Sequence, residues 1–379
     1  MNIKSGTCVA YLVATAAFGI DNVWAMSAIQ DEVCMAPGHV DMKNKGRMDA
    51  WIVKVDNGMD TLWEKVIGGK KDEYMLDAVN IPDGGCIFVG TKDISRDRFR
   101  DFWLIKTDKY GDIQWSKTYG GDGDDIAYVA KMIDKDIVVA GVTYPRGRKT
   151  TEAWLARIDS DGSIVWSKNI NTYENNFAYD LTVTKDKKLL VAGINDAQKK
   201  NWWDAWVLKL DLEGNVIWDK FYGGDRTDSA YSIVETYNHN YLVAGSTDSK
   251  GNGQLDAWVF EIDAQGEMQE EWLFGGSRND AALSIITTQP NSYWFAGYTE
   301  SKGKGRQDGW VVSVDTRKDY KTAATYGGTG DDYIYKLMPI NNDRLLTQGG
   351  TTPEGESHFS AWLNIIDDSN ALIDEKIFK

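Results

Sequence analysis

Carboxylates recur in this sequence at a nearly constant spacing, and their oxygen atoms could bind a cation or transfer protons. The residues at this recurring place are Glu73, Asp125, Asn176, Asp228, Asp280 and Asp332, each 51 or 52 residues after the one before. If the fold gathers them around one axis, they could hold Ca²⁺, which prefers oxygen ligands. The alternative is that each Asp caps the backbone of its own turn. We favour capping because the position repeats so regularly; no other cofactor is suggested, and the candidate metal ligands are Glu73, Asp125, Asp228, Asp280 and Asp332.

Four loops concentrate basic residues on an otherwise acidic chain, and three of them add aromatic rings. The candidate binding residues in these loops are Arg96, Arg98, Phe99, Tyr144, Arg146, Arg148, Trp202, Trp203, Lys302, Lys304 and Arg306. Aromatic rings beside Arg and Lys could hold a sugar ring, an anionic glycan or an acidic protein segment. The simpler interpretation is a set of solvated loops in which Trp203 covers the edge of a sheet.

Signatures of catalysis are scarce. The sequence has no G-x-S-x-G elbow, no H-E-x-x-H pair, no Walker loop and no Gly-rich dinucleotide fingerprint. A pair of carboxylates could still perform acid–base chemistry if one had a raised pKa. The candidate acids, however, recur almost identically in every repeat, whereas catalysis normally needs one asymmetric cluster.

Seven tryptophans in "DAW"-like phrases reveal the architecture that must position these residues. They are Trp51, Trp103, Trp154, Trp206, Trp258, Trp310 and Trp362, at intervals of 51 or 52 residues. A period near 50 residues fits the blades of a β-propeller. Within 206–210, Trp206, Leu208 and Leu210 alternate with Val207 and Lys209, the period of two that is typical of a strand. We therefore predict an all-β, seven-bladed β-propeller of four-stranded repeats, each about 52 residues long.

Each repeat is expected to contain four strands, which we call a to d in chain order. In the fifth repeat, strands a, b and c correspond to 229–236, 241–247 and 256–263, and strand d resembles 216–222. Because strand direction alternates, the d–a and b–c loops emerge on one face, and the a–b and c–d turns on the other. All four basic loops are b–c loops, so we call their side the b–c face. The recurring carboxylates open strand a, at the axis.

Two further patterns support this scaffold. Eleven of the sixteen Trp occupy the aligned tryptophan positions of strand c or strand d, where inter-blade packing is the expected role. The strand d members are Trp63, Trp115, Trp166 and Trp218. The c–d turns read Asp-x-x-Gly, in which Asp caps the turn and Gly accepts a positive φ. The last turn has Asn370 at the place of this Gly.

The segment "AWVLKLDLEGNVIWDKFYGGDRTDSAYSIVETYNHNYLVAGST" resembles the bacterial β-propeller repeats called SBBP, found in secreted bacterial proteins. The resemblance extends over nearly all of the chain after its N-terminal segment. It implies a propeller fold and almost nothing about activity, because this repeat family shares no catalytic residues. Strand d of the fifth and sixth repeats departs from the pattern, since "QEEWLFGG" and "KTAATYGG" lack the aligned Trp and Lys.

Composition limits the partners and predicts export. A formal charge of −15 disfavours nucleic-acid binding, and no apolar segment after the N-terminus is long enough to cross a membrane. Residues 1–25 resemble a signal peptide, with "VWA" ending at Ala25 as the expected cleavage site. A cut after Ala16 would preserve more of the first strand, so it remains the alternative. The expected propeller domain is 26–379, in a periplasmic or extracellular protein.

Cys34 and Cys86 are 52 residues apart and so occupy equivalent points in neighbouring repeats. Facing sheets lie about 10 Å apart, whereas a disulfide needs Cα atoms within about 7 Å. Export favours a bridge, but this geometry argues against one unless the first blade is irregular.

These observations together predict an exported, noncatalytic β-propeller that binds a protein or glycan through its b–c face. The alternative is a polysaccharide lyase or hydrolase that uses the channel carboxylates. A purely structural spacer is the third possibility.

Overall fold

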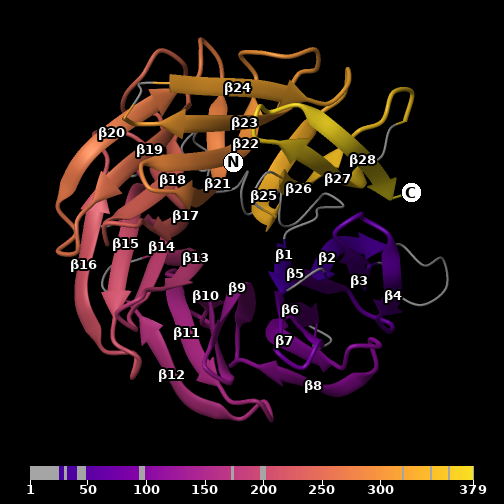
Figure 1. Cartoon of the computed structure of the whole chain (residues 1–379). Coiled ribbons are helices and arrows are strands. Elements are labelled where there is room, and N and C mark those ends of the chain that lie inside the picture. The colour runs from indigo at the N-terminus through magenta and orange to yellow at the C-terminus, as the bar shows by residue number, and fades with distance from the viewer. Residues whose placement is uncertain are drawn as a thin grey trace.

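The structure, a computed structural model, describes residues 25–29, 32–40, 48–93, 99–171, 175–196, 202–317, 320–341, 344–356 and 359–378. Within these ranges the chain forms 28 strands and no helix. The strands make seven four-stranded antiparallel sheets. Figure 1 shows them as blades of a ring, numbered here 1 to 7 in chain order. The predicted all-β, seven-bladed β-propeller is therefore confirmed.

The first strand of each blade lies beside the centre of the ring, and the second strand pairs with it (Figure 1). The first strands are β1 (Ala25–Ile29), β5 (Glu73–Asn80), β9 (Asp124–Ile133), β13 (Asn176–Val183), β17 (Asp228–Glu235), β21 (Asp280–Gln289) and β25 (Asp332–Asn341). The second strands are β2 (Glu32–Val40), β6 (Cys86–Asp93), β10 (Asp136–Tyr144), β14 (Leu189–Asn195), β18 (Tyr241–Thr247), β22 (Ser292–Thr299) and β26 (Arg344–Thr351).

The third strand carries the repeated tryptophan, and the fourth strand forms the rim. The third strands are β3 (Asp49–Asp56), β7 (Arg100–Thr107), β11 (Glu152–Ile158), β15 (Asp204–Leu210), β19 (Asp256–Ile262), β23 (Asp308–Asp315) and β27 (Ser360–Asp367). The fourth strands are β4 (Thr61–Ile67), β8 (Ile113–Tyr119), β12 (Ile164–Ile170), β16 (Val216–Tyr222), β20 (Met268–Phe274), β24 (Tyr320–Tyr326) and β28 (Leu372–Phe378).

The core lies between the blades. Every residue of β15 is buried, because both faces of that strand are covered by neighbouring sheets. One inter-blade cluster packs Leu189 and Val191 of blade 4 against Val138 and Leu155 of blade 3. At the rim, β16 exposes its first two residues, since no further strand covers it. This layering explains why strand c reads as a nearly continuous apolar run.

The tryptophans hold neighbouring blades together, as predicted. Trp206 and Trp258 are fully buried in the inter-blade clusters. In strand d, the indole Nε1–H of Trp166 donates to the Leu212 carbonyl of the next blade at 2.8 Å. Trp218 makes the corresponding bond to Ala264 at 3.2 Å. These side chains belong to the scaffold.

The c–d turns also form as predicted. Oδ1 of Asp211 accepts hydrogen bonds from the backbone N–H groups of Glu213 and Asn215, at 3.0 and 2.8 Å. Gly214 then closes the turn with a φ of +76°, a conformation that glycine adopts without a steric cost. In the last blade Asn370 adopts φ +65° at this place, which Asn tolerates better than most residues.

Blades 7 and 1 close the ring by side-chain packing. Each is built from four consecutive strands, so neither end of the described chain completes the other's sheet. The rings of Trp51 and Phe378 lie 5.4 Å apart, and Nζ of Lys376 donates to the Met59 carbonyl at 2.5 Å. Blade 1 has its inner strand β1, which begins at Ala25. The predicted signal peptide lies, apart from Ala25, outside the described residues, and both cleavage sites remain predictions.

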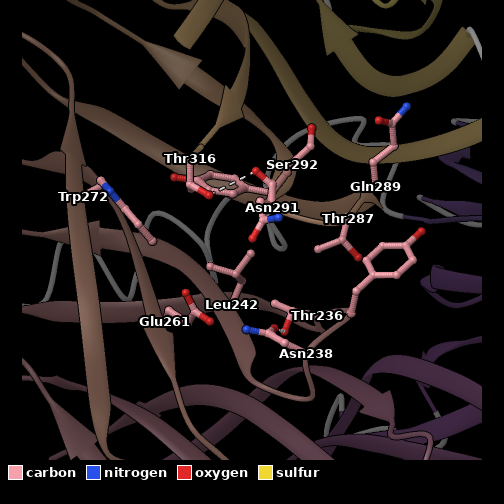
Figure 2. A pocket seen from close by; sticks show the side chains of 12 residues that line it. Thr236, Asn238, Leu242, Glu261, Trp272, Thr287, Gln289, Asn291, Ser292 and Thr316 are labelled. Carbon is pink, nitrogen blue, oxygen red and sulfur yellow. Dashed lines mark hydrogen bonds between the residues drawn. The ribbon is translucent and has the colours of Figure 1, made fainter. Parts of the chain in front are cut away.

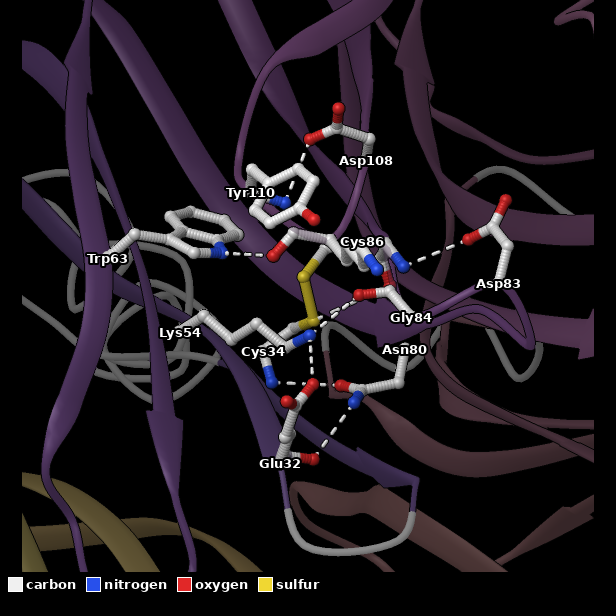
Figure 3. Close-up of polar contacts among 12 residues, drawn as sticks. Glu32, Cys34, Lys54, Trp63, Asn80, Asp83, Gly84, Cys86, Asp108 and Tyr110 are labelled. Atoms are coloured by element: carbon white, nitrogen blue, oxygen red, sulfur yellow. Dashed lines mark hydrogen bonds and ion pairs between the residues drawn. A yellow bond between two sulfur atoms is a disulfide. The ribbon is translucent and has the colours of Figure 1, made fainter.

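A disulfide joins Cys34 and Cys86 (Figure 3), so the geometric argument against a bridge was wrong. Their Cα atoms are 6.1 Å apart. The spacing of facing sheets is an average, and blades that radiate from an axis converge toward it, where strands a and b lie. Asn80 fixes the approach, since its Oδ1 accepts from the Cys34 N–H at 2.8 Å and its Nδ2 donates to the Glu32 carbonyl at 2.9 Å.

Candidate binding face on blades 2 to 4

The b–c loops of blades 2 and 3 meet through an arginine and an aromatic ring. The guanidinium of Arg146 lies 5.3 Å from the centre of the Phe99 ring, within the range of a cation–π contact. Arg146 is exposed, and it forms no ion pair with the described residues. Arg96 and Arg98, which were predicted to lie nearby, are outside the described residues.

Arg148 has a different role from Arg146. Its Nη1 lies 2.6 Å from Oε1 of Glu152, and the Oε2 of Glu152 accepts from Asn169 at 2.8 Å. The guanidinium therefore anchors its loop to strands c and d of its own blade. Of the two arginines in this loop, Arg146 is the one whose guanidinium is not paired with a carboxylate of the described chain and could therefore pair with a ligand.

A row of aromatic rings continues across blades 3 and 4. The ring of Phe177 lies 6.0 Å from Tyr144 and 5.6 Å from Trp203, both edge to face. Trp203 is half-buried in this cluster, where it packs against Phe177. Trp202 is half-buried as well and pairs with no ring of the described chain. We call Phe99, Tyr144, Arg146, Phe177 and Trp203 the aromatic–arginine patch.

Tyrosines on the inner strands extend the patch toward the axis. Tyr179 lies 6.1 Å from Phe177, 5.4 Å from Tyr128 and 5.9 Å from Tyr231. In β13 and β17, Tyr179 and Tyr231 stand at register shifts, where one residue is left without a partner across the ladder. Such bulges redirect a side chain out of the regular alternation. Burial raises the pKa of the Tyr128 and Tyr179 hydroxyls, so both remain protonated donors.

Sequence reasoning missed Phe177 and these tyrosines. The signal was present as a recurring aromatic residue three positions after the acid that opens strand a, in Asp125 to Tyr128 and Asp228 to Tyr231. Alternation alone places such a residue in the core, because a bulge cannot be recognised from the period of the strand.

The basic residues of the sixth blade do not join the patch. Nζ of Lys302 lies 5.3 Å from the Trp310 ring of its own blade. The backbone N–H of Lys304 donates to Oδ1 of Asp308 at 3.0 Å. Arg306 forms an ion pair with Asp331. This loop is therefore folded onto its own blade and its neighbour, and the nine predicted binding residues that the structure describes do not all contact one another.

The recurring carboxylates bond to their own turns. Oδ2 of Asp228 accepts from the Gly224 N–H at 2.8 Å and from the Ser249 hydroxyl at 2.7 Å, and Oδ1 accepts from Thr247. Asp280 repeats this pattern with Gly276, Ser301 and Thr299. Asp125 and Asp332 accept from the corresponding glycines, Gly121 and Gly328. Glu73 accepts from Gly69 at 3.3 Å and lies 3.6 Å from Lys92.

These contacts support the capping interpretation. Burial raises the pKa of Asp228 and of Asp332, while their hydrogen bonds act in the opposite direction. Within the described ranges, no three His, Cys, Asp or Glu side chains group closely enough to hold a metal ion. Calcium binding by the five acids stays a prediction, to be tested in solution.

Further along the axis, the inner strands carry a set of buried charges. Oδ2 of Asp77 accepts from the Ala130 N–H at 2.8 Å, and Oδ2 of Asp180 accepts from the Ile233 N–H at 3.0 Å. Each carboxylate thus reaches the strand of a following blade. Nζ of Lys336 lies 4.0 Å from Oδ1 of Asp77, and the charges of Asp77 and Asp180 raise its pKa against the opposing effect of burial. These residues connect the inner strands.

Comparisons with known proteins identify the fold. No family model matches the chain, and no curated protein matches its sequence, so membership of the SBBP repeat family is not confirmed. Among solved structures, the Pan2 WD40 domain of Neurospora crassa has a TM-score of 0.56 at 10% identity, covering 86% of this chain and 85% of that one. Puromycin hydrolase has a TM-score of 0.59 at 11% identity, covering 93% and 54%. YCF48 bound to D1 peptide has a TM-score of 0.51 at 10% identity, covering 87% and 89%.

At these identities the likeness extends to the fold alone. The chain spans about half the length of puromycin hydrolase, since the match covers 54% of that protein. We therefore do not assign the activity of that protein to this chain. Within the part of the chain that the structure describes, no helix is long and apolar enough to span a membrane.

Proposed function

We propose that this protein is an exported, noncatalytic interaction propeller that binds an extended, acidic protein segment at the aromatic–arginine patch. One observation carries the proposal: Arg146 is exposed on the Phe99 ring, without a carboxylate partner in the described chain, two residues after Tyr144, which begins a row of aromatic rings. On a chain with a formal charge of −15, an unneutralised arginine beside aromatic rings favours an anionic partner.

The chemistry of the patch suits a protein segment. Arginine binds carboxylates through two parallel hydrogen bonds, and tyrosine and tryptophan supply contact area with little loss of conformational entropy. The half-buried rings of Tyr144 and Trp203 offer such area beside Arg146. The YCF48 structure, a propeller of similar fold, contains a bound peptide, and this supports a peptide-binding mode without identifying the partner. An anionic glycan is the competing ligand.

The catalytic alternative has less support. The carboxylates that it requires at the channel accept hydrogen bonds from their own turn amides and hydroxyls, as Asp228 and Asp280 do. A general acid or base needs a reactive group directed at a substrate. We therefore place the function of this propeller in binding.

Selection from a displayed random peptide library against the purified protein tests the proposal. We expect enrichment of peptides that combine Asp or Glu with an aromatic residue. Fluorescence anisotropy with a synthetic copy of an enriched peptide should show about tenfold weaker binding to a Phe99→Ala/Arg146→Ala variant, as expected for the loss of one charge-assisted bond and its packing.

Arg306→Ala is the matched control, because Arg306 is an arginine of a b–c loop that is already paired with Asp331. It should leave the affinity unchanged. Equal binding to all three proteins would contradict the assignment of the patch. Enrichment of no peptide, together with patch-dependent binding of a sulfated glycan, would contradict the choice of a protein partner.

A further inference from the structure

One position in strand c, three residues after the repeated tryptophan, changes its charge along the chain. It is occupied by a cation in blades 1 to 4, namely Lys54, Lys106, Arg157 and Lys209. In blade 5 the residue is Glu261. Where the cation is replaced by a carboxylate, the space between the two blades loses its positive charge and can accommodate a positively charged group instead.

The interface between blades 4 and 5 shows what the cation does. Nζ of Lys209 donates to the Tyr241 hydroxyl at 2.8 Å and lies 5.1 Å from the centre of the Tyr241 ring. Asp186 of the a–b turn stands 4.0 Å from the same nitrogen. A phenol oxygen, a ring and a carboxylate thus surround one ammonium group between two blades.

The next interface, between blades 5 and 6, has the tyrosine of this arrangement but lacks the ammonium group. Tyr293 occupies in blade 6 the place that Tyr241 occupies in blade 5. Its side chain is 1% exposed, and its hydroxyl has no hydrogen-bond partner among the described residues. Burial raises the pKa of Tyr293, and the nearby charges of Glu261 and Glu270 raise it further. A buried hydroxyl without a partner costs free energy, so a ligand that formed a hydrogen bond with it would be favoured.

A cavity lies at this interface, on the face of the a–b and c–d turns (Figure 2). Its volume is about 50 Å³. Tyr293, Glu261, Trp272 and Asn238 are among its lining residues. In blades 1 to 4 strand d carries a tryptophan at the position where blade 5 has the exposed Glu270, so the indole that closes the four preceding interfaces is missing here.

We propose that the cavity between blades 5 and 6 binds a primary ammonium group. Three features of the cavity match this cation: the free Tyr293 oxygen can accept one N–H, the Glu261 carboxylate can accept another, and the Trp272 and Tyr293 rings, 5.6 Å apart, attract a positive charge. Oε1 of Glu261 is held by Asn240 at 2.7 Å, which orients the carboxylate. The site is separate from the b–c face and independent of the function proposed above.

The ammonium could belong to a small free amine or to a lysine side chain of a partner protein. Calorimetric titration with n-butylammonium chloride, and separately with Nα-acetyl-lysine methylamide, addresses both sources. Sodium chloride and n-butanol serve as ligand controls. We expect millimolar affinity for both amines, as befits so few contacting atoms, and none for the controls. A butylammonium affinity equal to or above that of the lysine probe indicates a free amine, and the reverse order indicates a lysine side chain.

Two variants locate the binding. Tyr293→Phe removes the unpartnered hydroxyl and should weaken amine binding about tenfold while leaving the protein folded. Glu261→Lys should recreate the arrangement of Lys209, with the new ammonium bonding to Tyr293, so that it abolishes amine binding and raises Tm. Glu213→Lys makes the same charge change at an exposed turn of blade 4 and should leave both quantities unaltered.

Three results would overturn the proposal. The first is no amine binding to the wild-type protein. The second is equal binding of n-butanol, which would indicate a site for an apolar chain. The third is amine binding that Tyr293→Phe leaves intact, which would place the ammonium elsewhere; this arm remains decisive even if Glu261→Lys fails to fold.

Discussion

The Cα atoms of Cys34 and Cys86 lie 6.1 Å apart, although the residues are separated by 52 positions and belong to neighbouring blades. The bridge joins strand b of blade 1 to strand b of blade 2. Blade 1 is also one side of the ring closure, where it contacts blade 7 through side chains, among them the Trp51–Phe378 ring contact and the hydrogen bond from Lys376 to the Met59 carbonyl. The disulfide thus gives blade 1, whose sheet shares no strand with blade 7 in the described chain, a second covalent link to blade 2.

Removing the disulfide should lower stability. A Cys34→Ala/Cys86→Ala variant is expected to lose about 2–4 kcal/mol of unfolding free energy, because the bridge restricts the unfolded chain. Guanidinium titration followed by tryptophan fluorescence measures the loss. Dithiothreitol should destabilise the wild-type protein and leave the variant unchanged; an equal effect on both would show that the bridge contributes nothing.

A missing hydrogen bond in blade 6 offers a stabilising substitution. The indole N–H of Trp103 donates to the Ser116 hydroxyl at 2.8 Å, and Trp154 does the same with Ser167 at 2.7 Å. Trp310 has Ala323 at the corresponding place, and its buried Nε1 finds no partner in the described chain.

Ala323→Ser should therefore stabilise the protein by about 1 kcal/mol, the net value of one buried hydrogen bond. The change is measured as a shift in the denaturation midpoint. Ala323→Val is the matched control, since it adds bulk and strand propensity without an acceptor. A gain as large in the Val variant would exclude the hydrogen bond as the cause.

Asp101 should make stability depend on pH in the acidic range. Burial, and then the charge of Asp125, raises the pKa of Asp101 from 3.8 to about 6. The folded protein consequently binds a proton that the unfolded chain releases between these values. The stabilisation from this group is complete below pH 4 and is lost as the pH rises through 6.

Unfolding free energies measured from pH 4 to pH 7 test this sign. Asp101→Asn should decline less over that range than the wild-type protein, whereas Asp122→Asn, an exposed neighbour, should follow the wild-type curve. If the Asp101 variant and the wild-type protein had parallel curves, the carboxyl group would have an ordinary pKa.

The two adjacent tryptophans of blade 4 should differ in their effect on stability. Trp203 packs on Phe177 at 5.6 Å, so Trp203→Ala is expected to cost about 1–3 kcal/mol. Trp202 makes no ring contact with the described residues, and Trp202→Ala should change stability by about 0.5 kcal/mol or less. Thermal unfolding of both variants measures the difference, and equal losses would mean that Trp202 is packed as well.

The calcium hypothesis is tested by thermal unfolding in EDTA and in millimolar Ca²⁺. Because Asp228 and Asp280 already accept three hydrogen bonds each, we expect superimposed curves. Asp280→Asn should lower Tm equally in both buffers. A rise of several degrees with Ca²⁺, absent from this variant, would instead establish a cation site.

The sequence by itself determined the propeller, its seven blades and the scaffold role of the tryptophans. These features follow from residues that recur at the same position of successive repeats. Trp206, Trp258 and Trp310 are equivalent positions of strand c, and Asp211 and Gly214 form the turn that follows it. Strand alternation and turn chemistry act over a few residues, so neighbours along the chain are sufficient to predict them.

Only the tertiary structure decided which side chains meet. It brought Arg146 to Phe99 and paired Arg306 with Asp331. It placed Tyr293 and Glu261 in the lining of one cavity. It also joined Cys34 to Cys86, against the expected spacing of the sheets. These contacts cross from one blade to the next, where distances depend on how far sheets converge and where strands bulge. A sequence period specifies equivalent positions, but convergence and bulges decide whether equivalent positions touch.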